Sequence, residues 1–81
     1  MIPRVAEASF VRNYTIHLRF TDDTEGDVDL RDELYGEIFE PLKDTAFFQK
    51  FFVHPEFQTL AWPNGADLAP EYLYEKVQLP A

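Results

Sequence analysis

The residues most able to do chemistry lie on the polar face of an expected N-terminal sheet. His17 occupies an alternating segment, and the register derived below places Glu7 and Asp29 on either side of it, with Asp27 opposite Arg19. A histidine oriented by a carboxylate is the general base of hydrolytic triads. The sequence shows no serine, histidine and aspartate constellation around His17, and an open sheet face offers no pocket. We therefore interpret these charges as cross-strand pairs and predict no catalytic residue.

An acidic run follows, with seven carboxylates from Asp22 to Glu33, and such a run could be a calcium-binding loop. With Gly26 at the sixth place of an EF-hand loop, the first place would be Thr21 and the last Asp32 in place of glutamate. An EF-hand also needs flanking helices, whereas these flanks alternate as strands do. We interpret the run as a solvated hairpin and predict no metal site and no cofactor.

Three strands are needed to position these side chains. Residues 14–21 form the clearest of them, because apolar and polar side chains alternate along the segment. The preceding segment pairs with it when Phe10 faces Tyr14 and Ala6 faces Leu18, which leaves a three-residue loop ending on Asn13, a residue that tolerates the left-handed conformation.

The third strand follows an acidic turn at residues 22–24. When Val28 faces Leu18, its side chain falls on the same face of the sheet as the other buried side chains. The prediction is a three-stranded antiparallel meander in which Leu18 lies between Ala6 and Val28 on the buried face.

The middle of the chain is expected to cover this sheet. Gly36 and Pro41 exclude a long helix over residues 31–42, so short helical turns are predicted there. Asp44 is a suitable N-cap for a short helix through Phe51. Its phenylalanines form a wide apolar stripe, which we interpret as core, with binding to a partner protein as the alternative. The partner-binding candidates are Phe47, Phe48, Phe51 and Phe52.

The last third holds the only tryptophan and is expected to close the fold. A strand from Phe57 to Trp62 should reverse at Pro63-Asn64-Gly65, and a helix should begin near Pro70. Residues 73–74 of that helix are expected to contact a buried Trp62. The alternative is a small-ligand pocket with aromatic walls and a few polar groups. Its candidate residues are Trp62, Asn64, Asp67 and Tyr72.

Composition limits the function classes. The 81 residues fit one domain, residues 1–81, of small α+β architecture: an antiparallel sheet, with a later strand or hairpin, covered by short helices. Fifteen acids against seven bases give a net charge of −8, which disfavours direct binding to nucleic acid or to anionic membranes. Cysteine is absent, and no apolar run is long enough for a signal peptide or membrane span, so a cytoplasmic location is expected.

Several stretches resemble a bacterial family of short proteins, domain-of-unknown-function family 2442. The similarity covers nearly the whole chain. Two turns depart from the family pattern: Asp22–Gly26 stands where a shorter Asp-Gly turn is common, and Thr45 follows Asp44 where proline is common. The stretches that carry the resemblance are Pro3-Arg4-Val5, Tyr14-Thr15-Ile16-His17-Leu18-Arg19-Phe20, Phe39-Glu40-Pro41-Leu42 and Trp62-Pro63-Asn64-Gly65-Ala66-Asp67.

The resemblance implies a compact α+β domain and no assigned chemistry. Some relatives are joined to a helix-turn-helix, and some lie beside another small gene in a toxin–antitoxin-like arrangement. Our leading hypothesis is a non-enzymatic protein-binding module that pairs with a basic protein, as an antitoxin does, with a homodimer left open. The competing hypothesis is a small-ligand binder or enzyme that uses the pocket described above.

Overall fold

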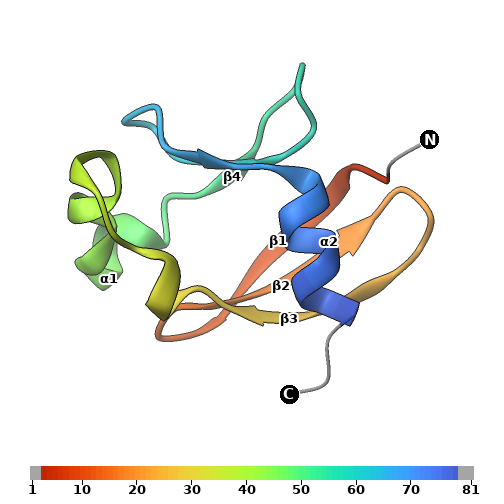
Figure 1. Cartoon of the computed structure of the whole chain (residues 1–81), viewed down its shortest axis with the longest axis horizontal. Coiled ribbons are helices and arrows are strands. Elements are labelled where there is room, and N and C mark those ends of the chain that lie inside the picture. Colours follow the sequence, from red (N-terminus) through yellow and green to blue (C-terminus); the bar gives the residue numbers. More distant parts are fainter. Residues whose placement is uncertain (1–2, 79–81) are drawn as a thin grey trace.

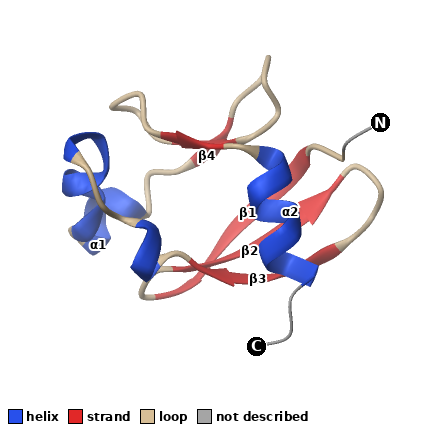
Figure 2. Cartoon of the chain, viewed as in Figure 1, coloured by secondary structure: helices blue, strands red, loops and turns tan. Residues whose placement is uncertain are grey.

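Two antiparallel three-stranded sheets form the framework of the computed structural model, which describes residues 3–78 (Figures 1 and 2). The first sheet has the order β1-β2-β3 and the second β4-β5-β6. This architecture confirms the predicted α+β class. The strands are β1 (Val5–Arg12), β2 (Thr15–Phe20), β3 (Glu25–Asp29), β4 (Phe52–Val53), β5 (Leu60–Ala61) and β6 (Asp67–Leu68).

Short helices connect and cover the sheets. Two 3-10 helices, η1 (Arg31–Glu33) and η2 (Glu37–Lys43), and the single-turn α1 (Thr45–Phe48) lie between them, and α2 (Pro70–Gln78) follows the second sheet. The second sheet contacts β1, and α2 packs on β3, as Figure 1 shows. None of the described helices has the length and apolar character needed to cross a membrane.

The meander is present, but the predicted pairing of its first two strands is wrong by two residues. Leu18 faces Ala8, not Ala6, and Phe10 faces Ile16, not Tyr14. A two-residue turn replaces the expected three-residue loop, and β1 has register irregularities on both sides of its central segment. Asn13 does adopt the left-handed conformation, with a φ of 45°.

The pairing of the second and third strands is also displaced by two residues. Ile16 faces Val28, and Leu18 faces Gly26, so Leu18 does not lie between Ala6 and Val28 as predicted. The hairpin loop occupies residues 21–23, one position earlier than expected, and Asp23 takes the left-handed conformation with a φ of 71°. Because a shift of two preserves the face of every side chain, Val28 is still buried.

The helical segments follow the prediction at their starts more closely than at their ends. Asp44 caps α1, and its Oδ1 accepts a hydrogen bond from the amide of Ala46 at 3.0 Å. The helix ends at Phe48, not at Phe51, since Phe52 already pairs with Ala61 in the second sheet.

The closing segment reverses where the sequence predicts. The amide of Gly65 donates to the Trp62 carbonyl at 3.1 Å, and Gly65 has a φ of 93°, which glycine adopts without steric cost. The strand before it is shorter than the predicted Phe57–Trp62 segment, because residues 55–57 form a turn and Gln58 has a φ of 50°. The last helix begins at Pro70, as predicted.

Trp62 is a central core residue, with 1% of its surface exposed. Its indole Nε1 donates to the Phe48 carbonyl at 2.8 Å, and the two rings lie 5.8 Å apart. Leu73 of α2 belongs to the same buried cluster. Tyr74 instead packs edge-on against Phe20, at 5.0 Å between ring centroids, and so ties α2 to the first sheet.

Candidate functional site

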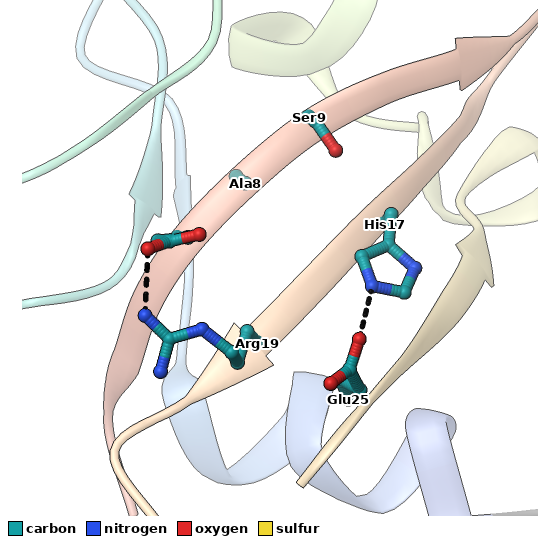
Figure 3. A pocket seen from close by; sticks show the side chains of 6 residues that line it. Ala8, Ser9, His17, Arg19 and Glu25 are labelled. Carbon is teal, nitrogen blue, oxygen red and sulfur yellow. Dashed lines mark hydrogen bonds and ion pairs between the residues drawn. The ribbon is translucent and has the colours of Figure 1, made fainter. Parts of the chain in front are cut away.

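The solvent-facing side of the first sheet gathers charged side chains from all three of its strands (Figure 3). Burial of alternate residues of β2 in the core turns His17 and Arg19 outward, between β1 and β3. We call this surface the acidic face, and define it by its five carboxylates: Glu7, Asp23, Glu25, Asp27 and Asp29.

Both ring nitrogens of His17 contact carboxylates of β3. Nδ1 lies 2.7 Å from Asp27 Oδ1, and Nε2 lies 3.0 Å from Glu25 Oε1. The hydrogen bond to Asp27, and secondly that to Glu25, raise the pKa of His17 above its ordinary value. The prediction of two carboxylates around His17 is right in number, but the named neighbours Glu7 and Asp29 are wrong because the register is displaced by two.

Arg19 is held by carboxylates in the same way. Its Nη2 donates to Glu7 Oε1 at 2.6 Å, and its Nη1 lies 3.4 Å from Asp23 Oδ1. The hydrogen bond from Arg19 lowers the pKa of Glu7. Arg19 of β2 therefore pairs with Glu7 of β1. Asp27, the predicted partner of Arg19, faces His17 instead.

A cavity of about 180 Å³ opens on this face, whereas the sequence suggested a surface without one. Ser9, His17 and Glu25 are among its lining residues, and Ser9 is the cross-strand neighbour of His17 (Figure 3). Ser9, His17 and Asp27 thus share one row of the sheet. In a triad the second ring nitrogen of the histidine faces the serine, but Nε2 of His17 lies 3.0 Å from Glu25 Oε1, so the row lacks the geometry of a triad.

On the acidic face, sequence reasoning missed Ser9 and Glu25 as neighbours of His17. Asn13 was the available signal, because asparagine favours the left-handed conformation that a two-residue turn requires. Such a turn at Asn13-Tyr14, with one extra residue in β1, brings Ser9 opposite His17.

The acidic face carries an excess of negative charge. Its five carboxylates outnumber the basic side chains in the same rows, which are Arg12, His17 and Arg19, and His17 and Arg19 both pair with carboxylates of the face. The carboxylates remain open to solvent: the side chain of Asp23 is 89% exposed and that of Glu7 is 70% exposed. Within residues 3–78, no group of three or more His, Asp or Glu side chains is arranged to hold a metal ion.

The four phenylalanine candidates occupy different environments. Phe48 is fully buried, and Phe47 and Phe51 are partly buried against the core. Phe52 is 40% exposed, and its ring lies 6.3 Å from that of His54 on the projecting β4–β5 connection. The structure therefore places three of the four in or against the core and leaves Phe52 the most accessible.

The four pocket candidates separate into two pairs. Trp62 is buried. Asn64 accepts a hydrogen bond within its turn, from the Ala66 amide to its Oδ1 at 3.1 Å, and its Nδ2 donates to the Ile38 carbonyl of η2 at 2.9 Å. Asp67 and Tyr72 line a second cavity of about 300 Å³, on the side of the molecule where η1, η2, β6 and α2 meet.

Fold and surface together define a small α+β domain with an acidic sheet face. Residues 5–78 match the family model described as a protein of unknown function, DUF2442, and the chain belongs to that family. Comparison with curated proteins gave no match, and comparison with solved structures gave none either.

Proposed function

We propose that this protein is a non-enzymatic binding module of the bacterial cytoplasm that pairs with a basic protein through the acidic face. The observation that carries the proposal is the internal pairing of His17 and Arg19, which leaves the face with an unbalanced negative charge in a fixed arrangement. Exposed ion pairs of this kind contribute only about 0–1 kcal/mol each to stability, so folding alone gives little reason for the arrangement.

The partner's chemistry follows from the charge of this surface. Three of the carboxylates, Glu25, Asp27 and Asp29, occupy every second position of β3 and so lie on one side of the sheet, where they present acceptors to lysine and arginine side chains. The net charge of −8 over the whole chain would steer a basic protein toward it and repel nucleic acid. An antitoxin-like role, in which the protein neutralises a basic partner, is the specific form of this proposal.

The test begins with capture of partners from an extract of the source cell at low and at moderate salt. The captured protein is then purified and titrated by calorimetry against three forms of the present protein, each first shown to be folded. These are the wild type, a face variant and a control variant. The face variant carries Glu7→Gln, Glu25→Gln and Asp27→Asn, and the control carries Glu56→Gln, Glu71→Gln and Glu75→Gln, three exposed acids outside the face.

Both variants lose three carboxylates, and those of the face variant are the ones that pair with His17 and Arg19. The proposal expects a basic partner, binding that weakens with salt, and a loss of about tenfold or more in affinity for the face variant against about twofold for the control. Equal losses of affinity in the two variants would show that binding depends on net charge and not on this face. Unchanged binding by the face variant would refute the proposed surface.

A further inference from the structure

The second cavity combines aromatic walls with carboxylates at one place. Three aromatic residues, Tyr35, Phe39 and Tyr72, and two acidic residues, Glu33 and Asp67, are among those that line it. Its volume of about 300 Å³ lies at the lower end of the range for small-molecule sites. Two segments far apart in the sequence contribute to it: η1, η2 and the connection between them, and β6 with the start of α2.

A cation is the ligand that this lining favours. Aromatic rings attract cations through their negatively charged faces, and recognition of quaternary ammonium groups by several rings is a recurrent use of this effect. The carboxylates exclude an anion, because they would repel it. The apolar walls supply few of the oxygen ligands that a hard metal ion such as calcium or magnesium requires.

The protein already binds an ammonium group of its own at the edge of this site. Nζ of Lys76 lies 3.1 Å from Glu33 Oε1 and 5.5 Å from the centroid of the Tyr72 ring. The edge of this site therefore already places an ammonium group between a carboxylate and an aromatic ring. Lys76 neutralises Glu33, whereas in the described part of the chain no ion pair engages Asp67.

We propose that this cavity binds a small organic ammonium ion, with Asp67 as its counter-charge and the rings of Tyr35, Phe39 and Tyr72 as its walls. The site is separate in sequence and structure from the acidic face, so the two proposals stand independently. It also accounts for two of the residues that the sequence singled out, Asp67 and Tyr72.

The test uses choline as the probe and amide chemical shifts of the isotope-labelled protein as the readout. Its uncharged isostere, 3,3-dimethylbutan-1-ol, has the same shape without the charge, and sodium chloride at equal ionic strength controls for screening. We expect saturable shifts confined to residues 33–39 and 67–72, and binding of the isostere about tenfold weaker than that of choline. Equal binding of the isostere, shifts elsewhere, or no saturation would overturn the proposal.

Two exposed positions allow substitution without disturbing the core. Asp67→Asn removes the counter-charge, and Tyr35→Ala removes a ring that is 71% exposed. Each should weaken choline binding about five- to tenfold, while Asp32→Asn, an exposed acid of η1 that does not line the cavity, should leave it unchanged. Equal effects of Asp67→Asn and Asp32→Asn would show a general charge effect and contradict the site.

A last arm distinguishes a free ligand from a side chain of another protein. A tripeptide with trimethyllysine between two glycines carries the same ammonium group on a chain. Choline should bind at least as tightly as this peptide. A peptide that binds about tenfold more tightly, with shifts extending beyond the cavity, would overturn the small-molecule assignment and indicate a protein ligand.

Discussion

Replacement of Trp62 by alanine should remove the largest fully buried side chain of the hydrophobic core among the described residues. The side chain is 1% exposed, packs against Phe48, and donates its only hydrogen bond to the Phe48 carbonyl at 2.8 Å. Emptying a large aromatic site costs roughly 3–5 kcal/mol. For 81 residues, typical stabilities amount to about 4–12 kcal/mol, so Trp62→Ala should lose a large part of the total.

Trp62→Phe separates packing from hydrogen bonding. It retains an aromatic ring but leaves the Phe48 carbonyl without its donor, and should cost about 1–3 kcal/mol, less than alanine. Phe57→Ala is the matched control, because Phe57 is 60% exposed and its loss should change stability by no more than about 0.5 kcal/mol.

Urea unfolding followed by far-ultraviolet circular dichroism measures all three variants, since that signal does not require tryptophan. The midpoint should fall in the order Phe57→Ala, Trp62→Phe, Trp62→Ala with an unchanged slope. A loss below about 1 kcal/mol for Trp62→Ala would refute the reasoning, because it would mean that the indole contributes little to the core.

Three further outcomes test the sheet and its turns. The pKa of the His17 ring, measured by nuclear magnetic resonance, should lie above 6.5 in the folded protein and closer to 6.5 in Asp27→Asn. Its contribution to stability is therefore complete below about 6.5 and disappears as the pH rises through the folded pKa. A folded pKa below 6.5 would contradict the pairing. Gly26→Ala places a Cβ 2.9 Å from Val77 Cγ1 and should cost roughly 1–3 kcal/mol in urea unfolding, less in a Val77→Ala background; equal costs in both would exclude the clash. Gly65→Ala forces a φ of 93° on alanine and should lower stability by about 1–2 kcal/mol in thermal melts, which an unchanged transition would refute.

Local signals in the sequence predicted the elements, but the length of one loop and the position of another decided how the strands pair. Alternation located β2, Asp44 located the start of α1, and Pro70 located the start of α2. The pairing of β2 with its neighbours depended on one turn that is a residue shorter than predicted and on another that lies one position earlier than predicted. Apolar parity cannot detect a displacement of two, because it leaves every side chain on the same face.

The site was less predictable than the fold for the same reason. Which carboxylate meets His17 depends on register, so Glu25 and Asp27 replaced the predicted Glu7 and Asp29. The second cavity lies where η1, η2, β6 and α2 pack together, and no short sequence motif predicts such a tertiary contact. Asp67 was found only because it lies beside a recognisable turn.

The most direct test of the central claim is a map of the interface on the protein itself. Amide chemical shifts of the isotope-labelled protein are followed while its purified basic partner is added at low salt. The proposal predicts that the largest perturbations fall on β1, β2 and β3, centred on residues 17, 19 and 25–29, and diminish with added salt. Perturbations centred on α2 or on the β4–β5 connection, with residues 25–29 unaffected, would contradict it.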